Sequence, residues 1–117
     1  MKMTVVVTIL VVLGVLLFAS IVMSEVAQTK NPYAGNAKIA AEGADIFKKN
    51  CQVCHGEGGK GDICPNLTTK SKKYGDADQD LFTTISNGRP GGMPNWDSAL
   101  GPDKIWKVIT YIRSIEK

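Results

Sequence analysis

The sequence predicts an all-α fold, in which one small helical domain follows an apolar N-terminal segment. Apolar residues recur every three or four positions over 37–50, over 78–87 and again after Pro102, which is the spacing of a helix with one buried face. Little of the domain has the alternating pattern typical of a strand. The chain has 117 residues, enough for one such domain and an appendage.

The N-terminal segment, residues 4–23, contains no charged residue and is rich in Val, Leu and Ile. A helix of this length spans about 30 Å, roughly one bilayer core, whereas the apolar part of a signal peptide runs to about 7–15 residues. We therefore expect residues 1–24 to be a membrane anchor or a signal peptide. Lys2 at its inner end favours placement of the domain on the periplasmic side of a bacterial inner membrane, anchored there or soluble in the periplasm after cleavage.

Residues 25–37 are polar and include Asn31-Pro32 and Gly35-Asn36, which predicts a flexible linker before the domain at 38–117. The net charge of +3 is too small to indicate a nucleic-acid partner. A cluster of three lysines lies in the middle of the domain, namely Lys70, Lys72 and Lys73. We expect it to be solvated, with a docking patch as the alternative.

The first helix is predicted over 37–50, with Ile39, Ile46 and Phe47 on its apolar face. Gly43 interrupts it at a cost of roughly 1 kcal/mol against Ala, so close approach of another helix is the expected reason for it. The glycine-rich residues 56–61 match G-x-G-x-x-G, but no strand precedes them and no helix follows, so we expect a tight loop.

The second helix is predicted over 78–87, with Gly88 just after its end. An irregular loop follows over 89–96. The last helix is predicted to carry Pro102 in its first turn and a stripe of aliphatic residues on one face. That stripe consists of Ile105, Val108, Ile109, Ile112 and Ile115.

The most informative motif is Cys51-Gln52-Val53-Cys54-His55, the C-x-x-C-H pattern for covalent attachment of one c-type haem. The two thiols would form thioethers with the haem vinyl groups, and His55 would supply one axial nitrogen to iron. A thioredoxin-like thiol pair would need a βαβ setting, which the pattern does not support. The same residues could also form a Cys₃His zinc site together with Cys64, or a simple cluster of buried thiols.

Met93 is the expected second axial ligand of the iron. His55 is the one histidine of the chain, and the other methionines belong to the N-terminal segment. With both axial positions filled by protein, electron transfer is expected rather than catalysis; a haem enzyme or gas sensor with an open iron site is the alternative. Arg89 and Trp96 flank the Met93 loop, and one of them is expected to hydrogen-bond a haem propionate.

These residues resemble those of a class I cytochrome c over about 43–115. Gly43 and Phe47 precede the haem motif, and Tyr111 lies in the last helix, as the family's helix-crossing residues do. The resemblance implies that the N- and C-terminal helices cross around one covalent haem. It further implies that the carbonyl of Pro65 accepts a hydrogen bond from His55 Nδ1, and that Met93-Pro94 is the axial pair.

A narrower resemblance links the chain to the cytochrome c-L group, through three short segments around Pro65, Met93 and Trp106. It implies electron transfer from a quinoprotein methanol or alcohol dehydrogenase. A respiratory shuttle, towards another cytochrome or a terminal oxidase, is the rival. Cys64 departs from the general family pattern; we expect a small buried residue there, with an intermolecular disulfide as the alternative.

Overall fold

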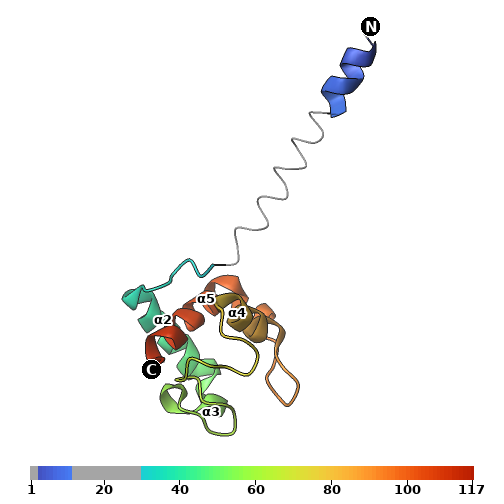
Figure 1. The fold of residues 1–117 in the computed structure, drawn as a ribbon. Helices are drawn as coiled ribbons and strands as arrows, with labels where there is room; N and C mark the ends of the chain where they lie inside the picture. Colours follow the sequence, from blue (N-terminus) through green and yellow to red (C-terminus); the bar gives the residue numbers. More distant parts are fainter. Residues whose placement is uncertain (1–2, 12–29) are drawn as a thin grey trace.

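The computed structural model describes residues 3–11 and 30–117 (Figure 1). Regular secondary structure in these two parts is helical throughout, apart from an isolated backbone bridge between Arg89 and Met93. The all-α prediction is therefore confirmed. The elements that follow residue 30 are α2 (Ala37–Asn50), α3 (Gln52–His55), the short 3₁₀ helix η2 (Glu57–Gly59), α4 (Asp78–Asn87) and α5 (Asp97–Ile115).

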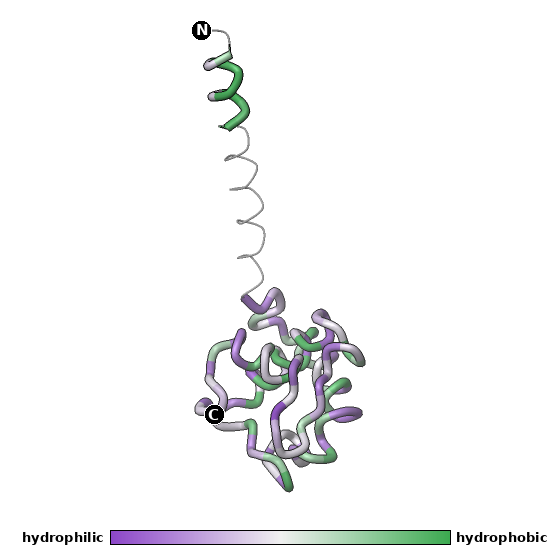
Figure 2. The backbone as a smooth tube through the Cα atoms, turned by 90° about the vertical axis from the view of Figure 1, so that its right-hand side faces the viewer, coloured by the Kyte–Doolittle hydropathy of each residue, from purple (hydrophilic) through white to green (hydrophobic). Residues whose placement is uncertain are grey.

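Residues 3–11 are helical and largely apolar, as the green run near the N-terminus in Figure 2 shows. Their large apolar side chains are exposed. The remainder of the predicted anchor or signal peptide, residues 12–24, lies outside the described residues. Among the described residues, we find no helix that combines the length and the apolar character needed to cross a bilayer.

The described end of the predicted linker packs on α5 and is not a free coil. Asn31 is buried, and its Nδ2 donates a hydrogen bond to Thr110 Oγ1 at 3.0 Å. The hydroxyl of Tyr33 donates to the carboxylate of Asp103. A buried amide is stable only when it is hydrogen-bonded, and its partner lies 79 positions away, so local sequence could not reveal this contact.

Helix α2 begins where Asn36 caps it, because the Asn36 side chain accepts a hydrogen bond from Ile39 N at 3.1 Å. Midway along α2, Gly43 is buried against α5. A Cβ atom at this position would lie 2.0 Å from the carbonyl oxygen of Lys107 and 3.1 Å from Cβ of Tyr111. The glycine is therefore required by the close approach of the two helices, as predicted.

The core forms where α2 and α5 cross, and α4 packs on α5 beside that crossing (Figure 1). The rings of Phe47 and Tyr111 meet at the crossing with their centroids 5.1 Å apart and their planes tilted by 53°, a favourable aromatic arrangement. The buried core residues are Phe47, Leu81, Ile85, Ile105, Trp106, Val108, Ile109 and Ile112.

The ends of α4 and the start of α5 follow local signals. Asp80 accepts a hydrogen bond from Ala77 N at 3.0 Å at the start of α4, and Gly88 ends the helix with φ of 69°. Helix α5 is kinked at Gly101, whose φ of 71° and ψ of 168° are not helical. The long part of α5 therefore begins at Pro102, as predicted, and a short helical turn from Asp97 precedes it.

Replacement of Gly43 by alanine tests the helix crossing. The added methyl group would collide with the Lys107 carbonyl, so we expect Gly43→Ala to lower the free energy of unfolding by about 1–3 kcal/mol or more. Denaturant unfolding measures the change. Asp45→Ala, at an exposed position of the same helix, is the control and should shift stability by no more than about 0.5 kcal/mol. Equal effects of the two variants would contradict the close-approach interpretation.

Candidate functional site

Helix α2 leads directly into the Cys51–His55 motif. Cys51 N donates to Phe47 O at 2.8 Å, so the last turn of α2 continues up to Cys51, and the one-turn helix α3 follows. Gly56 then reverses the chain with φ of 77°, and Gly61 N donates to the carbonyl oxygen of His55 at 2.7 Å. This tight loop fixes the backbone position of His55.

The imidazole of His55 is oriented by one hydrogen bond. Its Nδ1 lies 2.8 Å from the carbonyl oxygen of Pro65. A carbonyl oxygen accepts hydrogen bonds but cannot donate them, so Nδ1 carries a proton, and in the neutral ring Nε2 has the free lone pair. In metal sites this arrangement fixes the tautomer and raises the basicity of the free nitrogen.

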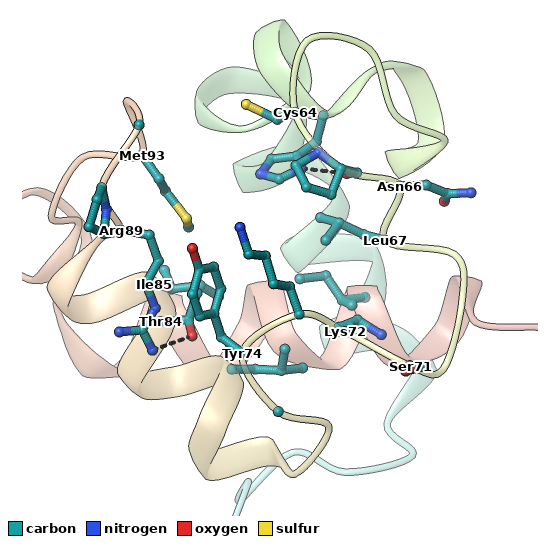
Figure 3. A pocket seen from close by; sticks show the side chains of 18 of the residues that line it. Cys64, Asn66, Leu67, Ser71, Lys72, Tyr74, Thr84, Ile85, Arg89 and Met93 are labelled. Carbon is teal, nitrogen blue, oxygen red and sulfur yellow. Dashed lines mark hydrogen bonds between the residues drawn. The ribbon is translucent and has the colours of Figure 1, made fainter.

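A cavity of about 300 Å³ lies between the Pro65 segment, α4 and the Met93 loop (Figure 3). Its volume is at the lower end of the range for cofactor pockets. Both His55 and Met93 line it, and the figure shows the Met93 sulfur reaching into the space between α4 and the segment around Cys64. The apolar lining also includes Ile63, Pro65, Leu67, Leu81, Ile85, Pro90 and Ile112.

The backbone of the Met93 loop is held in place on both sides. Arg89 N donates to Met93 O at 3.0 Å, and Trp96 N donates to Ile85 O at 3.1 Å. The loop also passes close to Gly88, where a Cβ atom would lie 2.5 Å from Met93 O. The position of the Met93 thioether therefore depends on backbone contacts between its loop and the end of α4, in addition to the packing of the Met93 side chain.

The three thiols occupy different places around this cavity. Cys64 lines it, whereas Cys51 packs at the edge of the core and neither Cys51 nor Cys54 is among the lining residues. Burial raises the pKa of the Cys51 thiol to about 11, and the neighbouring Cys54 adds to this shift. Burial and contact with Cys54 also raise the pKa of Cys64. At neutral pH both Cys51 and Cys64 are therefore protonated, uncharged thiols.

The described residues give no geometric support to a zinc site. Within 3–11 and 30–117, no group of three or more His, Cys, Asp or Glu side chains is arranged to hold a metal ion. The cavity instead offers a single imidazole and a single thioether.

Arg89 supplies a positive charge that lacks a counter-ion among the described residues. Its Nη2 donates to Thr84 Oγ1 at 2.8 Å, while its Nε is buried without a hydrogen-bond partner there. The guanidinium also lies over the Tyr74 ring, 4.6 Å from the centroid. A half-buried cation whose Nε is unpartnered in the described part of the chain gains from a nearby acceptor, so this corner of the cavity suits an anionic group.

The residues therefore fit a flat, largely apolar group that carries carboxylates and binds metal. The apolar walls suit its body, Arg89 suits a carboxylate, and His55 with Met93 suits the metal. Trp96, the other residue expected to contact a propionate, is not among the residues that line the cavity.

One expectation about this region is wrong. The run of lysines predicts a solvated Lys72, but its side chain is only 7% exposed and pairs with Glu116. The sequence also did not indicate that Thr84, Tyr74 and Leu81 would line the cavity. The helical period of α4 places Leu81 and Ile85 on one face, and that signal could have pointed to this wall.

A family model described as cytochrome C oxidase, cbb3-type, subunit III matches residues 38–112. The subunit FixP of a cbb3-type oxidase from Bradyrhizobium diazoefficiens is 46% identical over 79 residues, which cover 65% of this chain and 27% of that protein. The subunit CcoP from Cereibacter sphaeroides is 40% identical over 83 residues, covering 68% of this chain and 29% of that protein. The chain thus spans less than a third of the length of these relatives.

Two solved structures are similar to the domain. Cytochrome cL from Hyphomicrobium denitrificans has a TM-score of 0.74 at 32% identity and covers 78% of this chain and 55% of that chain. Cytochrome cL from Methylophaga aminisulfidivorans has the same TM-score at 26% identity, covering 78% of this chain and 62% of that chain. The resemblance to class I c-type cytochromes and to the cytochrome c-L group is thereby confirmed. The chain belongs to the family of cytochrome c oxidase, cbb3-type, subunit III, and its helical domain is a class I cytochrome c.

Proposed function

We propose that the domain carries single electrons on one covalently bound haem c, with His55 and Met93 as the axial ligands. The observation that carries this proposal is the cavity in which an oriented imidazole and a thioether line the same space next to the Cys51–Cys54 motif. Membership of a cytochrome c family supports it.

Each residue has a defined part in this proposal. Cys51 and Cys54 would hold the group covalently, and His55 would offer its free Nε2 to the metal, because Pro65 occupies Nδ1. Met93 would close the second axial position, while the aliphatic lining keeps water away. When bound, the haem supplies an iron that gains and loses one electron. With no open coordination position for a substrate, the domain relays electrons and is not itself an enzyme.

We infer that the acceptor is a terminal oxidase of the cbb3 type. The sequence relatives are named as subunits of such oxidases, which supports this direction of transfer. A quinoprotein alcohol dehydrogenase as donor is compatible with it, and the similarity to two cytochromes cL supports that donor. The proposed location is the periplasmic side of the inner membrane, with residues 1–24 as anchor or signal peptide. Oxygen uptake by cbb3-containing membranes, driven by the pre-reduced protein, tests the acceptor.

Intact mass and visible spectrum of protein matured in a bacterium test the central proposal. We expect the mass of one haem to be added to the chain, and the pigment to resist extraction by acidified organic solvent. The double variant Cys51→Ser/Cys54→Ser should lose covalent attachment, because no thioether can form. Cys64→Ser is the matched control and should retain the pigment. Colourless mature protein would refute the proposal.

Substitution of Met93 tests the axial assignment. We expect Met93→Ala to lose the near-infrared iron–sulfur band and to lower the midpoint potential on the order of 0.1 V, within the roughly 0.8 V range that axial ligands set. Binding of added carbon monoxide should rise, because the variant opens a coordination position. Met3→Ala, in the N-terminal helix, should leave the spectrum unchanged. A retained band in Met93→Ala would assign the ligand elsewhere.

Substitution of Arg89 tests the anionic subsite. Its positive charge disfavours the more positive oxidised iron, so Arg89→Leu should lower the midpoint potential, on the order of tens of millivolts. Potentiometric titration measures this shift. Trp96→Phe is the comparison variant and should leave the potential near that of the parent protein, because Trp96 does not line the cavity. An unchanged potential in Arg89→Leu would contradict the placement of Arg89 beside the bound group.

A further inference from the structure

Residues 68–76 form an irregular segment, here called the strap, that leads from the Pro65 side of the cavity to α4. Five consecutive residues of the strap line the cavity, namely Ser71, Lys72, Lys73, Tyr74 and Gly75. The strap contains neither helix nor strand. Among the residues that the structure describes, only two hydrogen bonds join its backbone to other backbone groups, Gly75 N to Lys72 O at 3.3 Å and Lys117 N to Thr68 O at 2.9 Å. Such a segment has little local stability of its own, so side chains must hold it in place.

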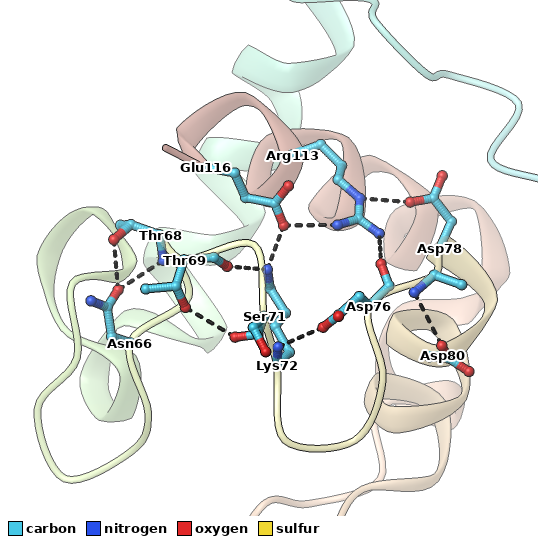
Figure 4. A network of polar contacts seen from close by, with 11 residues as sticks. Asn66, Thr68, Thr69, Ser71, Lys72, Asp76, Asp78, Asp80, Arg113 and Glu116 are labelled. Carbon is cyan, nitrogen blue, oxygen red and sulfur yellow. Dashed lines mark hydrogen bonds and ion pairs between the residues drawn. The ribbon is translucent and has the colours of Figure 1, made fainter.

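A buried ion pair joins the strap to the end of α5. The Nζ of Lys72 donates to Oε1 of Glu116, and the two side chains are 7% and 9% exposed. The same carboxylate oxygen accepts from Nη1 of Arg113 at 2.8 Å (Figure 4). Glu116 therefore lies between two cations, one from the strap and one from α5.

Further contacts of these cations fix the strap along its length. Lys72 Nζ also donates to Thr69 O, and Lys72 N donates to the carboxylate of Asp76, each at 2.6 Å. Arg113 Nη2 donates to the carbonyl oxygen of Asp76, and its Nε donates to Oδ1 of Asp78 at 2.7 Å. Because Asp78 is the first residue of α4, the network ties the strap, α4 and α5 together.

The strap meets the Met93 loop on its other side. The ring of Tyr74 lies under the guanidinium of Arg89, 4.6 Å from it, and Arg89 N is bonded to Met93 O. The strap thus bridges the ion pairs at the end of α5 and the loop that carries the thioether. A shift of the strap would open the cavity to solvent and disturb the support of this loop.

We propose that Glu116 is a positioning residue that holds the strap closed over the cavity and so keeps water and small external ligands from the metal. That the shielded group is a haem iron rests on the proposed function. That the strap is held closed rests on the ion-pair network described above. Loss of the carboxylate would leave the ammonium of Lys72 buried without a counter-ion, which favours an open strap. Glu116 itself touches neither the cavity lining residues His55 and Met93 nor the motif cysteines.

The test is Glu116→Gln in the mature, haem-loaded protein, followed by amide hydrogen exchange with mass spectrometry. We expect exchange in residues 68–76 to rise about ten-fold or more, with that of α2 unchanged. Imidazole added to the oxidised protein should also bind about ten-fold faster or more. Glu42→Gln is the matched control, because Glu42 pairs with Lys107 at 2.9 Å in a more exposed position away from the strap.

Lys72→Met is the second variant, for the case in which Glu116→Gln does not fold. It removes the buried ammonium of Lys72 while Glu116 keeps its pairing with Arg113, so the strap should loosen and the domain should stay folded. Lys72→Met combined with Glu116→Gln should exchange more slowly in the strap than Glu116→Gln alone, because no unpaired ammonium remains.

Three outcomes would overturn the proposal: unchanged strap exchange in both single variants, an equal rise in α2, or the same strap response in Glu42→Gln. A colourless chain would refute the proposed function instead, and the hydrogen-exchange result on the strap could still be read in that case.

Discussion

The crossing of α2 and α5 at Gly43 is the contact on which the rest of the domain depends. Without a side chain at Gly43, the backbone of α2 approaches the Lys107 carbonyl directly, and the rings of Phe47 and Tyr111 pack beside it. The crossing joins the two ends of the domain. It also sets the direction in which α2 ends, and the haem motif begins at the residue after that end.

The two side chains proposed as axial ligands are positioned by different means. His55 is oriented over a short stretch of chain, by its own turn and by the Pro65 carbonyl ten positions later. Met93 depends on tertiary contacts, because its loop is held against the end of α4 and against Arg89. The histidine side of the cavity is therefore built locally, whereas the methionine side requires that α4 and α5 have already packed together.

Local signals predicted the helices well. Helix α2 spans the predicted residues 37–50, and α4 ends at the predicted glycine, Gly88. The capping role of Asn36 was not predicted. The start of the long part of α5 at Pro102 was also predicted. The short helical turn that precedes it, from Asp97, was not predicted. Gly43 was a further local signal, because a glycine inside a helix is costly unless another backbone passes close to it.

Long-range polar contacts were not predictable in the same way. Lys72 belongs to a run of lysines that is typical of a solvated surface, yet its partner Glu116 lies 44 positions later. Asn31 lies in a polar segment typical of a linker, yet its amide is buried against Thr110. In each case the pattern of neighbouring residues is the same whether the side chain is solvated or paired.

The sequence by itself determined the helical class, the ends of α2 and α4, the glycine at the crossing, and the C-x-x-C-H motif that indicates the cofactor. Each of these depends on residues within a few positions of one another, where backbone propensity and fixed spacing act. The tertiary structure alone decided that Arg89 and not Trp96 faces the cavity, and that a strap with no regular structure is held by buried charges. Burial and charge pairing are properties of segments that meet only after folding, so no local pattern encodes them.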